Sequence, residues 1–167
     1  MGWLYPPHLL RTHPSPLLID SASAPSVLIE QDHPDLRLDE RILQTLVHRI
    51  VDAEARSLGT VSIVLTDHDT VLALNREHLG HDYLTDVLSF DLSEAPDRVD
   101  GEVYVDLDTA AERHEEFDTS FEEEARRYVA HGVLHLVGYD DRDADEQAVM
   151  RRLEDRFLAA VKEETSD

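Results

Sequence analysis

The alternation of short β-type runs with longer helical segments constrains the fold of this chain most strongly. Apolar and β-branched runs predict strands, whereas apolar residues spaced three to four apart predict amphipathic helices. Strands are expected at residues 26–31, 60–66, 85–92 and 101–106. Helices are expected at residues 39–54, 67–79, 108–115 and 120–137, with a last one starting near 143 or 145. A turn is expected at Gly59, an N-cap at Asp67, and a capping box at Ser120 with Glu123 three residues later. This order predicts an α+β domain in which helices pack on a small mixed sheet of about four strands.

The length and the terminal segments indicate one domain between two tails. The 167 residues, 41% of them hydrophobic, are enough for one core. We expect the domain at residues 26–162 and a short C-terminal tail at 163–167. Five of the seven prolines lie in residues 1–25, which are expected to form a flexible tail. These prolines interrupt the apolar stretch that a secretory signal needs, and no run reaches the roughly 18 apolar residues of a membrane span, so a cytoplasmic protein is expected.

The composition opposes general nucleic-acid binding. The chain has 37 acidic and 15 basic residues, and its formal net charge is −22. Such a surface lacks the basic side chains that neutralise phosphates. The acidic composition is compatible with solubility through self-repulsion and with a cytoplasm of high ionic strength, and it does not distinguish between them. Because there is no cysteine, disulfides and cysteine-ligated metals are excluded, and any metal must be held by His, Asp or Glu.

One segment, HGVLHLVGYDD at residues 131–141, has the spacing of a metal site. His131 and His135 are four residues apart on a predicted helix, so both imidazoles project from one face. Gly138 can end the helix and let Asp141 supply a third ligand. Two histidines and a carboxylate leave a fourth position for water, as in catalytic zinc sites; zinc is expected, although other divalent ions suit these donors. The alternative, two ordinary satisfied histidines, is disfavoured because the surrounding helix is apolar.

The residue after the first histidine bears on the reaction class. Zinc proteases of the H-E-x-x-H type use the glutamate at this position as general base. Here the position is Gly132, which argues against peptide hydrolysis by that mechanism. A metal-dependent hydrolase of another non-nucleic substrate stays open.

Three motifs together resemble the YbeY family of bacterial rRNA-maturation endoribonucleases. Residues 131–141 are similar to the family pattern H-G-x-L-H-L-x-G-Y-D-H. The dipeptide L-N at residues 74–75, followed by T-D-V-L-S-F at 85–90, is similar to a second family block, and G-E-V at 101–103 to a third. The blocks occur in the family's order and spacing, and the resemblance covers about residues 26–161.

The resemblance implies a zincin-like fold with one zinc ion per chain, held by His131 and His135, with Asp141 where the family usually has a third histidine. Aspartate is a competent zinc ligand, but it lowers the charge of the complex by one, which should make bound water less acidic. In a second departure, Leu79 stands where many members carry an arginine that is expected to contact substrate phosphate. Arg76 lies about one helical turn earlier and could replace it.

The resemblance further implies a single-strand-specific, metal-dependent endoribonuclease that processes the 3′ end of 16S rRNA and serves ribosome quality control. Its partners would be rRNA in the small ribosomal subunit, associated ribosomal proteins or an assembly GTPase. The alternative is a ribosome-assembly factor with a structural metal and little nuclease activity, which Leu79 and the acidic charge favour. No general base is evident beyond metal-bound water, and Asp86 and Asp140 are candidates only by their neighbourhood.

Five residues near the motifs are candidates for substrate contact: Arg76, Asn75, Thr85, Asp86 and Ser89. Each also has a structural explanation. Asn75 could bond the backbone at a helix end, and Thr85 and Asp86 could fix the turn into a strand. Ser89 would face one side of its strand whatever the function.

Two arginines and a tyrosine near the histidines also have alternative explanations. Arg126 and Arg127 lie one turn before His131 and could add local positive charge. Their spacing from the glutamates at 122–124 favours pairing along the helix instead. Tyr139 could pack over the metal site or cover the end of the helix.

Overall fold

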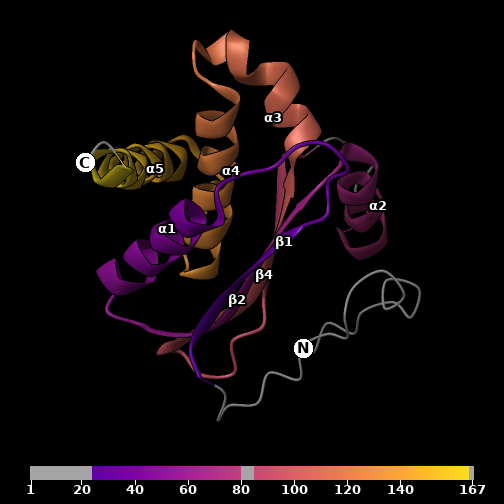
Figure 1. Ribbon diagram of the computed structural model, residues 1–167. Coiled ribbons are helices and arrows are strands. Elements are labelled where there is room, and N and C mark those ends of the chain that lie inside the picture. The colour runs from indigo at the N-terminus through magenta and orange to yellow at the C-terminus, as the bar shows by residue number, and fades with distance from the viewer. Residues whose placement is uncertain (1–23, 80–84, 166–167) are drawn as a thin grey trace.

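The structure, a computed structural model, describes residues 24–79 and 85–165 (Figure 1). Its strands are β1 (Ser26–Gln31), β2 (Ser57–Thr66), β3 (Val87–Asp91) and β4 (Arg98–Asp106). Its helices are α1 (Glu40–Ala53), α2 (His68–Leu79), α3 (Leu107–Arg113), the 3-10 helix η2 (His114–Phe117), α4 (Phe121–Leu136) and α5 (Ala144–Thr165). This element order confirms the predicted α+β class. The predicted N-terminal tail lies almost wholly outside the described residues.

The four strands form one mixed sheet in the order β1-β2-β4-β3. β1, β2 and β4 run parallel, with Val27 beside Val61 and Ile63 beside Val103. β3 is antiparallel to β4, with Ser89 opposite Val103, and forms one edge of the sheet. The predicted mixed sheet of about four strands is therefore confirmed.

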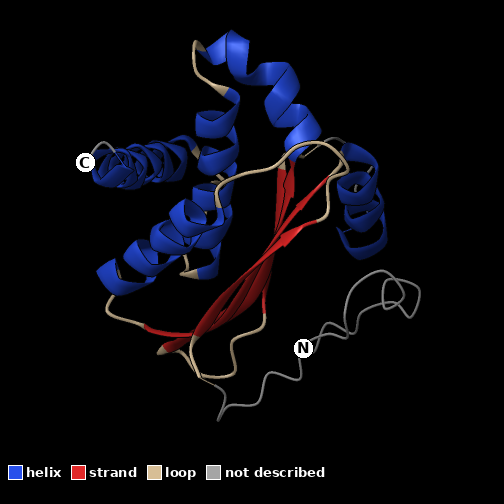
Figure 2. Ribbon diagram, in the orientation of Figure 1, coloured by secondary structure: helices blue, strands red, loops and turns tan. Residues whose placement is uncertain are grey.

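Helices cover both faces of the sheet unequally (Figure 2). α1 and α4 pack on one face, and α5 packs on α1 and α4 as an outer layer. α2 covers part of the opposite face, over β3 and β4. The main core lies under α1 and α4 and includes the fully buried Leu43, Ile50, Ile63, Val103 and Val133. A smaller cluster lies under α2 and includes Val64, Leu74, Leu88 and Tyr104.

The second strand begins earlier than predicted, and Gly59 is not in a turn. It lies inside β2, where the register with β4 shifts between Leu58 and Val61. The Asp100 carboxylate accepts a hydrogen bond from the backbone N–H of Thr60 at 2.8 Å. A Cβ at position 59 would overlap that carboxylate. The glycine is therefore required by Asp100, 41 residues away, rather than by a local turn.

The helix caps follow the predicted chemistry. Asp67 accepts from the N–H of Thr70, and Ser120 accepts from the N–H of Glu123. The expected return bond from Glu123 is absent among the described contacts, because its carboxylate pairs with Thr119 and Lys162 instead. At the other end of the chain, α5 continues to Thr165, three residues beyond the predicted domain boundary.

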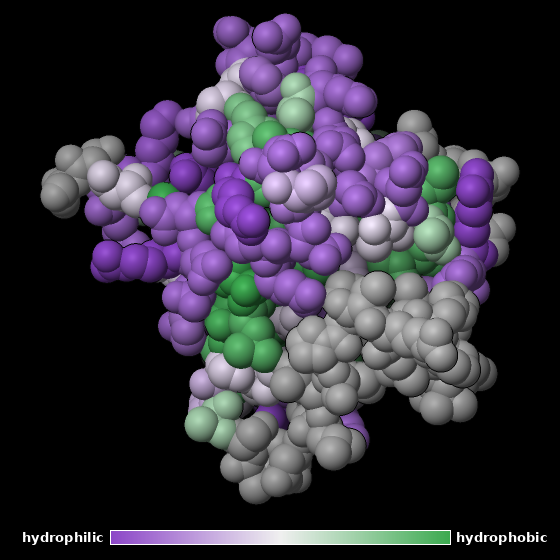
Figure 3. Space-filling view, turned by 45° about the vertical axis from the view of Figure 1, so that its right-hand side comes forward, coloured by the Kyte–Doolittle hydropathy of each residue, from purple (hydrophilic) through white to green (hydrophobic). Residues whose placement is uncertain are grey.

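The molecular surface is dominated by polar groups. On the face shown in Figure 3, hydrophilic side chains cover most of the described surface, and hydrophobic ones show in separate areas between them. None of the described helices is long and apolar enough to cross a membrane.

Candidate metal centre

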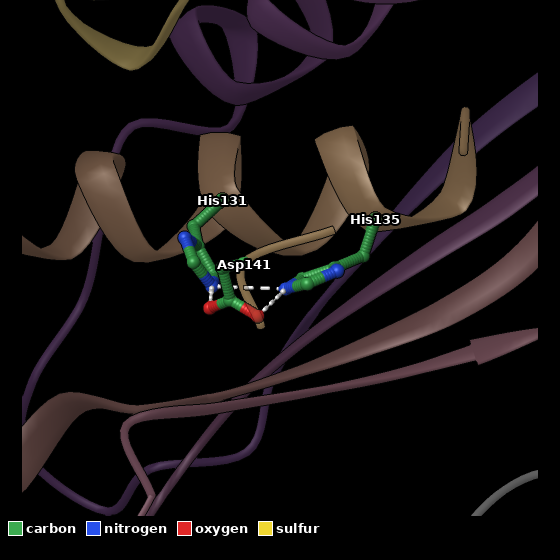
Figure 4. A group of neighbouring side chains, drawn as sticks. All are labelled: His131, His135 and Asp141. Atoms are coloured by element: carbon green, nitrogen blue, oxygen red, sulfur yellow. Dashed lines mark hydrogen bonds and ion pairs between the residues drawn. The ribbon is translucent and has the colours of Figure 1, made fainter. Parts of the chain in front are cut away.

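The helix α4 presents two histidines on one face, and the turn after it returns an aspartate to them (Figure 4). His131 and His135 are one helical turn apart, with their rings edge to face and the centroids 4.6 Å apart. Gly138 has a positive φ of 108° and ends the helix, as predicted. The backbone N–H groups of Gly138 and Tyr139 bond to the carbonyls of His135 and Leu134, which fixes the reversal. Asp141 then lies between the two imidazoles.

The three side chains converge as ligands of one ion. The Nε2 atoms of His131 and His135 are 3.0 Å apart. The carboxylate oxygens of Asp141 lie 3.3 Å from Nε2 of His131 and 3.7 Å from Nε2 of His135. Neighbouring ligand atoms of a tetrahedral zinc ion are about 3.3 Å apart. The donor set and its geometry therefore fit a divalent cation with an open fourth position.

Among the described residues, no other group of three His, Asp or Glu side chains brings its ligand atoms this close together. The structure thus assembles the three predicted ligands His131, His135 and Asp141. A His₂Asp set is compatible with zinc and with other divalent ions.

Glu154 on α5 is a part of the site that the sequence interpretation missed. Its carboxylate is 3.2 Å from Nδ1 of His131 and 3.3 Å from the guanidinium of Arg127. It is buried among the apolar residues of α5. A carboxylate on Nδ1 fixes the tautomer and leaves Nε2 of His131 free for a metal. The available signal was the spacing of Met150, Glu154, Phe157 and Val161, which places an acid inside an apolar stripe.

The two histidines differ in their affinity for protons. Burial lowers the pKa of His131, but the hydrogen bond and the charge of Glu154, together with Asp141 and Asp86, outweigh this and raise it. Burial, and then the neighbouring His131, lower the pKa of His135. His135 is therefore held in the neutral form that binds metals, and metal binding at His131 competes with a proton.

At position 132, where a zinc protease would carry its glutamate, α4 packs closely against the sheet. A Cβ at Gly132 would overlap Val103 and would lie 3.0 Å from Val87 and 3.1 Å from Oγ of Ser89. The Ser89 hydroxyl donates to the carbonyl of Gly132 at 2.8 Å. Ser89 thus ties β3 to α4, and this contact supports its structural explanation.

A cleft of about 670 Å³ adjoins the triad between α4, α5 and η2, and His131, Asp141 and Asp86 line it. Burial raises the pKa of the Asp86 carboxyl, against the opposing charge of His131. The hydroxyl of Tyr128 is also buried here, near the carboxylate of Glu124. Burial, followed by the charge of Glu124, raises the pKa of Tyr128. The cleft therefore combines a metal-type triad with further titratable groups.

The family is decided by comparison with known proteins. A family model described as Endoribonuclease YbeY matches residues 28–162, which include the triad and all three motifs. This chain belongs to the YbeY family.

Individual YbeY relatives agree with that assignment. An Endoribonuclease YbeY from Salinibacter ruber is 58% identical over 141 residues, covering 80% of this chain and 90% of the relative. One from Chlorobaculum tepidum is 35% identical over 125 residues, covering 75% and 90%. The solution structure of a protein from Thermotoga maritima superposes with a TM-score of 0.58 at 31% identity, covering 84% of this chain and 92% of the other.

The candidate substrate residues of the YbeY motifs are distributed over two faces of the sheet. Asn75 and Arg76 lie on α2, which covers the face opposite α4; Asn75 is buried and Arg76 is exposed. Leu79 is the last residue of α2. Thr85 donates to the carbonyl of Val87 at the entry to β3, in agreement with its structural explanation. Of the five candidates, Asp86 is the one that lines the cleft beside His131.

The remaining candidates near the histidines have other partners. Arg127 pairs with Glu154 and Asp155 of α5, so the expected pairing with glutamates of its own helix is wrong for this residue. Tyr139 donates to Glu54 at the end of α1, 2.7 Å away. Asp140 pairs with Arg142 at 2.8 Å.

Proposed function

We propose that this protein is a metal-dependent endoribonuclease that cleaves single-stranded segments of small-subunit rRNA, near the 3′ end of 16S rRNA. The observation that carries the proposal is the convergence of His131, His135 and Asp141 on one point beside an open cleft. Membership of the YbeY family and the endoribonuclease names of its relatives support the same reaction.

Zinc is the proposed cofactor, one ion per chain, because two imidazoles and a carboxylate with an open position are a catalytic zinc set. When bound, such an ion polarises a phosphoryl oxygen and lowers the pKa of its water. Other residues of the chain hold the three candidate ligands in position. Glu154 orients His131, and the closely packed Gly132 holds α4 against β3.

Asp86 is the proposed proton-transfer group. Its carboxyl lies on the cleft with His131, and burial raises its pKa above the usual range of an aspartate. A carboxyl with a raised pKa can take a proton from an attacking hydroxyl and return it to the leaving oxygen. This assignment gives a named role to the one of the five substrate-contact candidates that lines the cleft.

The proposed setting is the cytoplasm, where the enzyme would act on the small ribosomal subunit, with ribosomal proteins or an assembly GTPase as partners, in rRNA maturation and ribosome quality control. A net charge of −22 disfavours unaided capture of RNA, so such partners would supply part of the affinity. The second candidate is an assembly factor with a structural metal, which the same charge favours.

The test measures metal content and RNA cleavage on the same preparations. Wild type should contain about one zinc per chain and cleave an unpaired 16S 3′ precursor, whereas His131→Ala should lose both properties. His48→Ala, which removes an exposed histidine of α1 outside the triad and the cleft, is the matched control and should retain both. Metal without cleavage would favour the assembly factor. Cleavage that persists in His131→Ala would indicate a contaminating nuclease and refute the enzyme.

A further inference from the structure

We infer that the cleft beside the triad binds a single-stranded RNA segment, with Phe117 stacking on a base and arginines of the cleft walls contacting phosphates. This inference rests on the proposed function and names the surface that the substrate would use. The cleft is formed by η2, by α4 and by α5, and it is continuous from Phe117 to His131 and Asp141. Twelve residues of α4 and its cap, about 18 Å, separate Thr119 from His131, so a strand of a few nucleotides can extend from one end to the other.

The first observation is the distribution of positive charge. Five of the chain's 15 basic residues line this one cleft: Arg113, Arg126, Arg127, Arg151 and Lys162. Six acidic residues line it as well, whereas acidic residues outnumber basic ones 37 to 15 in the whole chain. A divalent cation on the triad would tip the local balance to positive. The cleft is therefore a place where this acidic protein can receive a polyanion.

The second observation is a cation with unused hydrogen-bonding capacity. Nε of Arg126 is buried on the cleft and has no hydrogen-bond partner among the described residues. Because a buried donor is costly to leave unsatisfied, its presence in a concave site indicates a polar occupant. Phosphate oxygens supply the acceptor that this N–H needs.

The third observation is an exposed aromatic ring on the wall of the same cleft. Phe117 is 49% exposed, and the Arg113 guanidinium lies 5.2 Å from its ring centroid. Unpaired bases stack on aromatic rings and on arginine planes, whereas bases in a duplex are already stacked on one another. An exposed Phe–Arg pair at the end of the cleft away from the triad therefore selects single strands over duplexes.

The test measures binding of a nuclease-resistant, fluorescein-labelled 2′-O-methyl RNA strand to the full-length, zinc-loaded protein by fluorescence anisotropy. Phe117→Ala should weaken binding about tenfold or more, and Phe117→Trp should restore it. Arg126→Gln should weaken binding and lower the slope of log K against log salt by about 0.7. A duplex of the same sequence should bind more weakly than the strand.

Two matched controls lie outside the cleft. Leu28→Ala removes the other large hydrophobic side chain that is exposed in the described residues, on β1 at the far edge of the sheet. Arg49→Gln removes an arginine of α1 that pairs with Glu164. Both should bind RNA as wild type does. Circular dichroism and zinc content, unchanged in all variants, exclude unfolding as the cause of a loss.

The outcomes separate this inference from the proposed function. If wild type binds and cleaves RNA while Phe117→Ala and Arg126→Gln behave as wild type does, the cleft assignment is overturned and the nuclease stands. If zinc-loaded wild type neither binds nor cleaves RNA, the proposed function fails and the cleft assignment with it. Loss in both cleft variants, with both controls intact, supports the assignment.

Discussion

Nδ1 of His131 donates a hydrogen bond to the buried carboxylate of Glu154, so a helix that supplies no metal ligand determines how one ligand points. Arg127 lies on the other oxygen of the same carboxylate. The candidate metal site is thus built on α4 and the turn after it, and one of its histidines is oriented from α5. This arrangement leads to the first prediction.

Glu154→Gln should weaken zinc binding about 10- to 100-fold, because the amide cannot stabilise the same His131 tautomer as strongly. Competition with a chromophoric chelator measures the affinity. Asp155→Asn, which also removes an acidic partner of Arg127 but does not touch His131, is the control and should bind zinc as wild type does. Equal affinities in the two variants would contradict a positioning role for Glu154.

Asp141→Ala should reduce the zinc content sharply, because two histidines alone leave the ion with too few ligands. Asp141→His should retain about one zinc per chain, since an imidazole can occupy the same position. Elemental analysis after gentle purification gives both values. Full zinc content in Asp141→Ala would remove Asp141 from the ligand set.

Gly132→Ala should destabilise the fold by about 1–3 kcal/mol, because the added methyl group would overlap Val103 and force α4 away from the sheet. Urea unfolding measures the change in the free energy of unfolding. Gly138→Asn is the contrasting variant: no atom lies within 4 Å of a Cβ at this position, and asparagine tolerates positive φ, so its cost should be smaller. An unchanged free energy of unfolding in Gly132→Ala would contradict this prediction and show that α4 can move away from the sheet without cost.

The His68–Asp106 pair should make stability depend on pH. The hydrogen bond that Nδ1 of His68 donates to the Asp106 carboxylate, 2.7 Å away, is the main cause that raises the pKa of His68. A histidine with a raised folded-state pKa contributes its stability fully below the unfolded value of about 6.5 and loses it as the pH rises through the folded value. Relative to His68→Gln, wild type should therefore lose stability above pH 6.5.

This difference should stay under about 1 kcal/mol, because the His68 side chain is a third exposed and solvent screens the pair. Urea midpoints of both proteins at pH 5.5 and pH 8.5 measure it. A stability difference that does not change with pH would exclude the pair as its source.

The element order and the convergence of the three candidate ligands could be predicted because both depend on local spacing. Strand and helix periodicity repeats within a few residues, and the separation of His131 and His135 by one helical turn follows from helix geometry alone. Asp141 comes three residues after Gly138, where the chain reverses, so it can return to the two histidines.

The parts that could not be predicted depend on contacts between distant segments. Glu154 reaches His131 across two helices that pack together, and Arg127 pairs with α5 rather than with the glutamates of its own helix. Gly59 resembled a turn residue in the sequence. Its glycine is required because the carboxylate of Asp100, on another strand, fills the space of a side chain at position 59. Each of these side chains has several possible partners at the sequence level, and tertiary packing selects one.

The spacing between α4 and the sheet has a consequence for how this fold can diversify. A glutamate at position 132 is a single codon change from glycine, yet its side chain would have to pass through the volume now filled by Val103 and Val87. The chain could acquire that base only after the helix had lifted from β3 and the Ser89 tether to Gly132 had broken. The close approach of α4 to the sheet therefore restricts position 132 to glycine, because a larger residue there requires a repacked core as well as the substitution itself.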